Sequence, residues 1–234
     1  MTPPGPGRDW RGWLGAPDRY GLVLVLILVS ALLVALAGPG WGLLPVVLAL
    51  AGTLLFTLHT SRAPPRVQRL ARWLVGAAVG LGLLASASGR EALAAGVLTA
   101  VAVLLVVATP PAIVRRLQQH PVVDAATVLG ALCIYLLLGL AFALGFGLTA
   151  VLDGGPFFAT VAAARPVDYL YFSFVTLTTV GYGDLTARGD LGRMLAVTEA
   201  LAGQLYLVAV VALLVGNVGR PRPPRPGRAP EDES

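Results

Sequence analysis

Residues 176–184 read TLTTVGYGD, and this polar, glycine-containing strip lies between two long apolar runs. The chain of 234 residues is 56% hydrophobic and only 12% charged, with a mean hydropathy of +0.79. Soluble domains carry roughly 25% charged residues, so the composition indicates an integral membrane protein. At membrane depth, non-helical backbone is tolerated only where it is buried in protein or lines a cavity. The strip therefore marks a specialised site.

Six apolar runs come close to the ~20 residues that a helix needs to cross a bilayer. None of them alternates apolar and polar residues with period two, which argues against the strands of a membrane barrel. The predicted fold class is therefore an all-α membrane protein with six transmembrane helices. The runs lie at residues 20–37, 41–58, 70–87, 92–108, 122–152 and 191–218.

The distribution of arginine predicts the orientation. The chain has no lysine, and 13 of its 17 arginines fall on the side of the predicted membrane that holds both termini. The positive-inside rule then places both termini in the cytoplasm of a multi-pass cell-membrane protein. The Pro/Gly/Arg-rich segments 1–19 and 220–234 are predicted to be disordered cytoplasmic tails. The first run ends in ALAG after a basic lead-in, so cleavage there as a signal peptide is the alternative.

A short helix is predicted immediately before the strip. Residues 166–178, PVDYLYFSFVTLT, begin with Pro166 and Asp168, residue types that suit the first turn of a helix. The segment is too short to span a bilayer, so we expect a re-entrant half-helix whose strip returns to the outside. Such a half-helix directs its partly negative C-terminus at the membrane centre, where it favours a cation.

The strip itself offers ligands for a dehydrated cation. The carbonyl oxygens of Thr179, Val180, Gly181 and Tyr182, together with the Thr179 hydroxyl, can replace the water shell of the ion. Gly181 and Gly183 can adopt positive φ, which helps successive carbonyls to face one axis.

These residues resemble a known family. TLTTVGYGD is similar to the selectivity filter of potassium channels, in which carbonyl oxygens coordinate the ion. YLYFSFVTLTTVGYGD resembles the pore helix and filter of bacterial potassium channels, and GRMLAVTEALAGQLYLVAVVALLVG resembles their inner helix. The resemblance covers residues 122–218. It implies K+ bound at the filter from Thr179 to Gly183, no other metal or cofactor, and a homotetramer, because each chain supplies a single filter.

Asp184 follows the filter at the expected outer mouth. Four such carboxylates would concentrate cations there, or each would brace its own loop through a hydrogen bond. Some family members pair this aspartate with a glutamate four residues before the first filter threonine. Val175 occupies that position here, so that pair cannot form, and filter inactivation controlled by it is not carried over to this chain.

Glu199 and Gly203 are the gating candidates. Glu199 is the acid deep in the last apolar run, and an ionisable residue there is expected to be functional. It either braces the pore helix through the hydroxyl of Thr176 or Thr178, or titrates as a gate. Gly203 shares its helix face and matches the hinge glycine of the family, with close helix packing as the alternative.

Six crossings with a pore between the last two resemble the layout of voltage-gated channels, but the fourth run carries no arginine within its apolar span. Its arginines follow Pro110 and Pro111. Arg66, Arg69 and Arg72 do have sensor-like spacing, but they precede the third run. We expect them to bind anionic lipid headgroups, with an unorthodox voltage sensor as the alternative.

The sequence thus predicts a four-helix membrane domain of unknown sensing role at residues 20–117 and a pore domain at residues 118–219. The predicted function is passive potassium conduction without steep voltage gating, which is neither an enzyme activity nor nucleic-acid binding. The alternatives are a weakly selective cation channel, a potassium transporter subunit and a non-conducting regulatory subunit. A transporter subunit would carry four degraded filters in one chain, whereas a single intact filter occurs here.

Overall fold

The computed structural model describes residues 20–38, 43–60, 64–118 and 125–217, so the predicted tails lie outside the described residues. Within these ranges the chain forms helices, with one isolated bridge between Phe158 and Ala187 and no longer strand. The prediction of an all-α membrane protein is confirmed. The helices are α2 (Tyr20–Leu36), α3 (Leu43–Thr60), α4 (Pro65–Ala87), α5 (Glu91–Gln118), α6 (Ala125–Asp153), α7 (Pro166–Leu177) and α8 (Asp190–Asn217).

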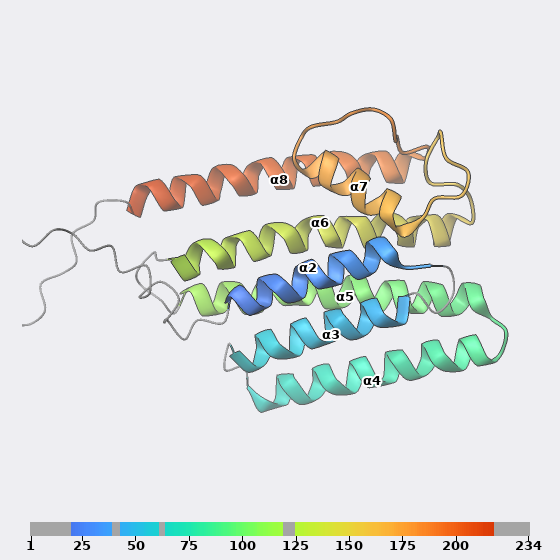
Figure 1. The fold of residues 1–234 in the computed structure, drawn as a ribbon, viewed down its shortest axis with the longest axis horizontal. Coiled ribbons are helices and arrows are strands. Elements are labelled where there is room, and N and C mark those ends of the chain that lie inside the picture. Colours follow the sequence, from blue (N-terminus) through green and yellow to red (C-terminus); the bar gives the residue numbers. More distant parts are fainter. Residues whose placement is uncertain (1–19, 39–42, 61–63, 119–124, 218–234) are drawn as a thin grey trace, which may run out of the picture.

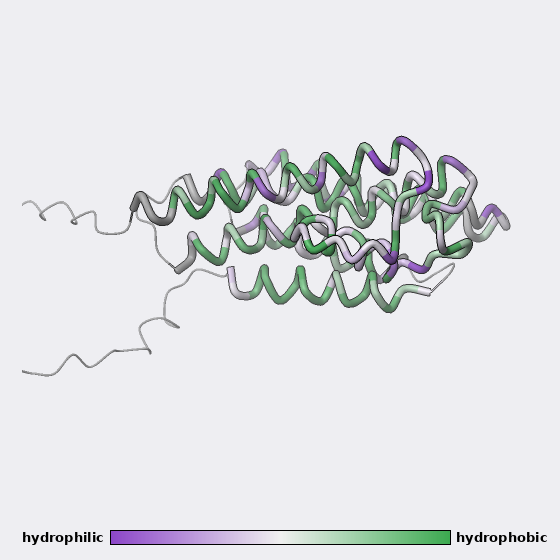
Figure 2. Tube along the Cα trace, turned by 90° about the horizontal axis from the view of Figure 1, so that it is seen from above, coloured by the Kyte–Doolittle hydropathy of each residue, from purple (hydrophilic) through white to green (hydrophobic). Residues whose placement is uncertain are grey.

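Three described helices are long and apolar enough to cross a membrane. These spans are Leu93–Arg115 in α5, Thr127–Asp153 in α6 and Asp190–Leu213 in α8. The apolar parts of α2 and α3 are shorter, and α4 belongs to neither group. Six crossings therefore stay a prediction. Most of the helical trace is hydrophobic, and hydrophilic positions are concentrated toward the right-hand end, with a few along the helices (Figure 2).

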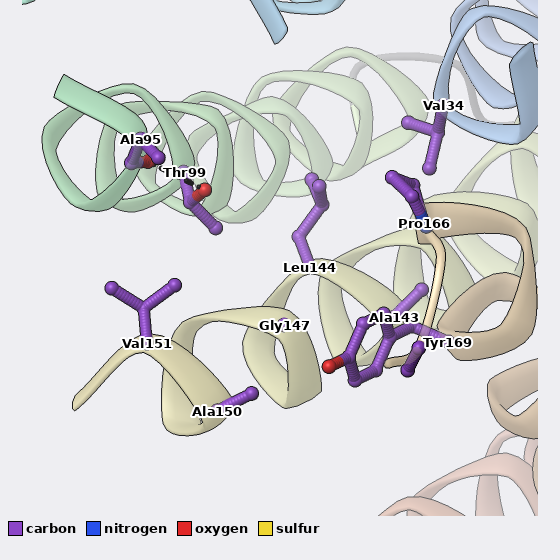
Figure 3. Close-up of a pocket in the computed structure, with 11 residues that line it drawn as sticks. Val34, Ala95, Thr99, Ala143, Leu144, Gly147, Ala150, Val151, Pro166 and Tyr169 are labelled. Carbon is purple, nitrogen blue, oxygen red and sulfur yellow. Dashed lines mark hydrogen bonds between the residues drawn. The ribbon is translucent and has the colours of Figure 1, made fainter. Parts of the chain in front are cut away.

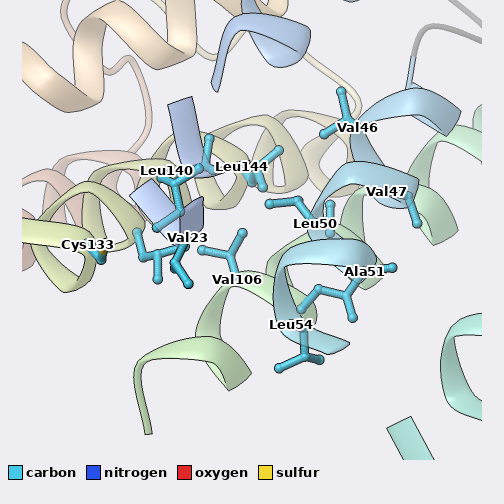
Figure 4. Packing of buried hydrophobic residues seen from close by; sticks show 14 of the residues in the cluster. Val23, Val46, Val47, Leu50, Ala51, Leu54, Val106, Cys133, Leu140 and Leu144 are labelled. Atoms are coloured by element: carbon cyan, nitrogen blue, oxygen red, sulfur yellow. The ribbon is translucent and has the colours of Figure 1, made fainter. Parts of the chain in front are cut away.

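The long helices lie side by side along the molecule, with α4 at one edge and α8 at the other (Figure 1). Helices α2, α3, α5 and α6 share one apolar core. Val23, Leu50, Val106 and Leu140, one from each helix, are almost fully buried and face one another (Figure 4). Helix α8 packs against α6 and α7, away from this core.

Two helix boundaries differ from those predicted. Helix α4 begins at Pro65, so Arg66, Arg69 and Arg72 lie inside its first turns rather than before it. Proline suits the first position of a helix, and arginine is a good helix former. Helix α5 continues through Pro110 and Pro111 to Gln118. Interior prolines remove helical hydrogen bonds, but the residues that follow them, Ala112 and Ile113, are buried in the core, and this packing holds the helix together.

An aromatic cluster supports the loops on either side of the strip. Phe146, Phe157, Phe158 and Phe172 are buried together with Ala187. Ring centroids of Phe146 and Phe172 are 5.1 Å apart, and those of Phe157 and Phe158 are 4.9 Å apart. Such edge-to-face contacts between aromatic rings are favourable. The cluster fixes the loop before α7 to the loop before α8, and so positions the strip between them.

Candidate functional site

The strip is held at the end of a short, capped helix. The Asp168 carboxylate accepts a hydrogen bond from the backbone N–H of Arg165 at 2.7 Å, and α7 begins at Pro166, as predicted. Twelve residues extend only about 18 Å, which is too short to cross a membrane. In Figure 1, α7 runs from one end of the molecule toward its middle, and the strip then turns back toward the same end. This is a re-entrant arrangement.

Beyond Leu177 the backbone leaves the helix. The N–H groups of Val180 and Gly181 both donate to the Val175 carbonyl, at 3.0 and 3.3 Å. Positive φ angles occur at alternate positions, with 59° at Thr179, 56° at Gly181 and 78° at Gly183. The glycine values were expected. The value at Thr179 was not, because positive φ is a steric outlier for a β-branched residue, and the sequence gives no signal for it.

The strip is open on one face of the single chain. The side chains of Val180 and Tyr182 are 53% and 70% exposed. Thr178 is also exposed, whereas Thr176 is half-buried. Among the described residues, no group of three or more His, Cys, Asp or Glu side chains could hold a metal ion. The strip from Thr179 to Tyr182 offers a cation its backbone carbonyls and the Thr179 hydroxyl, and the Asp184 carboxylate follows it.

Asp184 braces the strip from its outer end. Its carboxylate accepts a hydrogen bond from the Tyr171 hydroxyl at 2.9 Å, and its backbone carbonyl accepts one from Thr160 at 3.1 Å. The rings of Tyr171 and Tyr182 are stacked, with centroids 6.3 Å apart and only 5° between their planes. The bond to Asp184 raises the pKa of the Tyr171 hydroxyl above its usual value. Asp184 nevertheless remains exposed. Its carboxylate can therefore brace its own loop and still attract cations from solution.

Glu199 contacts the re-entrant helix, but through a residue that was not predicted. Its Oε1 is in hydrogen-bond contact with the hydroxyl of Ser173, and both side chains are fully buried. The prediction that Thr176 or Thr178 would be the partner is wrong. Ser173 lies one turn before the buried Leu177, on the face of α7 that meets α8, whereas the Thr178 hydroxyl donates to Phe174 O of its own helix at 2.6 Å. A serine inside the apolar stretch YFSFV was the available signal.

Gly203 lies against the end of α7. A Cβ atom at this position would come within 2.7 Å of both the carbonyl oxygen and Cδ1 of Leu177. The same carbonyl accepts a hydrogen bond from the Tyr135 hydroxyl of α6 at 3.3 Å. Glycine at position 203 therefore allows α8 to pack closely against α7. This is the role that was predicted as the alternative to a hinge.

An apolar stripe on α8 lies uncovered in the single chain. Its members recur every three or four residues, on one face of the helix. Each has more than half of its side chain exposed: Met194, Val197, Leu201, Leu205 and Val208.

A separate cavity of about 280 Å³ lies behind the start of α7, between α5 and α6 (Figure 3). Its lining is apolar apart from Thr99 and Tyr169, and the Thr99 hydroxyl already donates to Ala95 O of its own helix at 2.8 Å. This cavity does not suit an ion.

The arginine cluster of α4 is exposed. The Nε atoms of Arg69 and Arg72 make long contacts with carbonyls of their own helix, at 3.4 and 3.3 Å. Arg66 is exposed beside them, and Trp73, which directly follows Arg72, is 78% exposed. Helix α5 has no charged residue between Glu91 and Arg115. Arg66, Arg69 and Arg72 thus form a cluster on the surface of α4, and they do not form a row inside the bundle.

Comparison with family models matches the part of the chain that holds the strip. Residues 132–219 match the model of a family described as ion channel. Two pore potassium channel a of Oryza sativa subsp. japonica is 48% identical over 54 residues, which is 23% of this chain and 14% of that protein. Inward rectifier potassium channel Kirbac3.1 of Paramagnetospirillum magnetotacticum is 39% identical over 61 residues, or 25% of this chain and 21% of that protein.

Probable potassium channel protein 2 of Methanocaldococcus jannaschii is 41% identical over 58 residues, or 22% of this chain and 17% of that protein. The chain therefore matches only between 14% and 21% of the length of these relatives. No solved structure matches the chain.

Proposed function

We propose, from the premise that residues 132–219 belong to the potassium-channel pore family, that this chain is a subunit of a potassium-selective channel. Ions pass down their electrochemical gradient, and no chemical step is catalysed. The observation that carries the proposal is the alternation of positive φ at Thr179, Gly181 and Gly183 in an exposed strip at the end of a re-entrant helix. Alternating backbone conformation turns successive carbonyls to one side, where they replace the water around a K+ ion.

Electrostatics around the strip support a cation. The C-terminus of α7, which carries partial negative charge, precedes the strip directly. The carboxylate of Asp184 lies at its other end and is exposed. A cation therefore meets negative potential at both ends of the strip, which raises its local concentration and favours its entry.

Four copies of the chain complete the pore in this proposal. One strip cannot surround an ion, and rings of carbonyls come from symmetric assembly. The exposed Val180 and Tyr182 and the uncovered stripe on α8 leave apolar surface for neighbouring copies to bury. The assembly lies in the cell membrane with both termini in the cytoplasm, and Arg66, Arg69 and Arg72 bind anionic headgroups at its cytoplasmic surface.

The test is a reversal-potential measurement on the purified protein in lipid bilayers, with K+ on one side and Na+ on the other. We expect reversal close to the K+ equilibrium potential. Reversal near zero would favour the weakly selective cation channel, and absence of current would favour the non-conducting subunit. Net K+ movement against its gradient would favour a transporter subunit.

A matched pair of variants links selectivity to the backbone of the strip. A Cβ atom would meet open space at both Gly181 and Gly189, but only Gly181 has positive φ. Gly181→Ala should therefore lose K+ selectivity, because alanine disfavours that conformation, and Gly189→Ala should retain it. Equal behaviour of the two variants would contradict the assignment of the strip as the filter.

A further inference from the structure

We propose that Glu199 is a neutral carboxylic acid that donates its proton to Ser173, and that Glu199, Ser173 and Gly139 form a hydrogen-bonded chain across α8, α7 and α6. Glu199 thereby acts as a positioning residue for the re-entrant helix. The effect on conduction rests on the proposed channel function, but the protonation state does not.

The two contacts of the Ser173 hydroxyl need more protons than Ser173 can supply. The Ser173 hydroxyl oxygen lies 2.6 Å from the carbonyl oxygen of Gly139 and is also in hydrogen-bond contact with Oε1 of Glu199. A serine has one proton to donate, and a backbone carbonyl can only accept. If that proton goes to Gly139, the contact with Glu199 needs a second proton, which a carboxylic acid supplies and a carboxylate does not.

The opposite assignment leaves an unfavourable contact. If Ser173 donated to a Glu199 carboxylate, its oxygen would face the Gly139 carbonyl at 2.6 Å with no proton between them. Two acceptors at that distance repel each other. Only the neutral form of Glu199 satisfies both contacts of Ser173 at once.

The surroundings of Glu199 also favour its neutral form. The residue has no exposed surface, and its Oε2 has no hydrogen-bond partner within the described part of the chain. The ion pair found among those residues joins Arg165 to Asp168, at the start of α7, so no basic side chain in the described ranges is seen to pair with Glu199. On α6, the nearby titratable side chain is Tyr135, whose hydroxyl already donates to Leu177 O. An unpaired buried charge costs far more than one unpaired neutral oxygen.

Glu199 and Ser173 lie where α8 and α6 both contact the re-entrant helix. Ser173 lies one helical turn before Leu177, and Glu199 lies one turn before Gly203, which packs against Leu177. A polar contact and a steric contact therefore join α8 to successive turns of α7. Ser173 also donates to α6, where Gly139 leaves room for the Phe174 ring to approach closely. The last turn of α7, which leads directly into the strip, is held between two helices by this arrangement.

The protonation state can be tested by infrared spectroscopy of the full-length protein in lipid at neutral pH. The difference spectrum between wild type and Glu199→Gln should contain the carbonyl band of a protonated carboxylic acid, which shifts in deuterated buffer. Ser173→Ala should shift that band without abolishing it, so Ser173→Ala against wild type provides the test if Glu199→Gln does not fold. Carboxylate bands alone, in either comparison, would overturn the proposal.

The positioning role can be tested by a second matched pair. Glu199→Gln retains a neutral donor of the same shape, whereas Glu199→Met retains the volume and loses the donor. We expect Glu199→Gln to melt like wild type and Glu199→Met to show a lower melting temperature and a loss of K+ selectivity. Equal melting of Glu199→Met and wild type would overturn the role. Melting and infrared measurements need no current, so failure of the proposed channel function would be seen separately.

Discussion

Gly203 of α8 lies so close to Leu177 of α7 that a Cβ atom at position 203 would approach the Leu177 carbonyl oxygen to 2.7 Å. A backbone carbonyl cannot move aside as a flexible side chain can. The close approach of α7 and α8 therefore requires glycine at position 203. The C-terminal end of the re-entrant helix α7 is therefore in direct contact with α8, the helix that follows the strip.

Replacing this glycine should destabilise the protein. Gly203→Ala gains about 1 kcal/mol from helix propensity, but overpacking against the Leu177 carbonyl should cost about 1–3 kcal/mol. We expect a lower melting temperature in detergent. Gly145→Ala on α6 is the control, because a Cβ atom there meets nothing within 4 Å. Equal or higher melting of Gly203→Ala would favour the hinge interpretation instead.

The two roles of Asp184 can be separated by a pair of variants. Tyr171→Phe removes the hydrogen bond to Asp184 but keeps the charge and the stacked ring. Asp184→Asn removes the charge but keeps an oxygen that accepts from Tyr171. Tyr171→Phe should therefore lower K+ selectivity, measured as the reversal potential. Asp184→Asn should chiefly lower single-channel conductance at low ionic strength, where screening is weak. If Asp184→Asn lost selectivity and Tyr171→Phe retained it, the hydrogen bond between Tyr171 and Asp184 would not be what braces the strip.

Opening should depend only weakly on voltage. Moving one charge through 100 mV is worth about 2.3 kcal/mol, and steep gating needs roughly three or four charges per subunit. Helix α5 carries none between Glu91 and Arg115, and Arg115 is exposed near its end. Between about −100 and +100 mV, a range chosen around physiological potentials, single-channel recordings should show a shallow change of open probability. A steep response abolished by replacing Arg66, Arg69 and Arg72 with Gln would identify α4 as a sensor.

The arginine cluster of α4 should set the affinity for anionic lipid. Each arginine near a negative membrane surface contributes about 1 kcal/mol, so Gln at positions 66, 69 and 72 should weaken binding roughly a hundredfold. Native mass spectrometry of the protein with an anionic phospholipid measures this. Gln at positions 90, 165 and 188 removes as many exposed charges from other surfaces and serves as the control. An equal loss in both variants would indicate a net-charge effect only.

The parts that the sequence predicts best are those encoded locally. Pro166 and Asp168 mark a helix start through backbone chemistry that needs no partner, and the helix begins there. The family resemblance depends on consecutive motif residues, and the ion-channel family model matches residues 132–219 of the predicted range 122–218. Positive φ at Gly181 and Gly183 follows similarly from the freedom of glycine.

The parts that escaped prediction depend on contacts between distant segments. Ser173 and Glu199 are 26 positions apart, and which polar residue of α7 faces α8 depends on helix rotation. The passage of α5 through Pro110 and Pro111 depends on the burial of Ala112 and Ile113 against other helices. Positive φ at Thr179 opposes local preference, so only the surrounding structure can impose it.

Three contacts within one chain brace the strip: Asp184 with Tyr171, Glu199 with Ser173 and Gly203 with Leu177. In a ring of four such chains, damage to one brace leaves the braces of the other three copies intact. The loss of K+ selectivity should then depend on how many of the four copies carry the defect. Linked tetramers containing one, two, three or four Tyr171→Phe subunits should lose selectivity in graded steps, and a single altered subunit should not silence the whole ring.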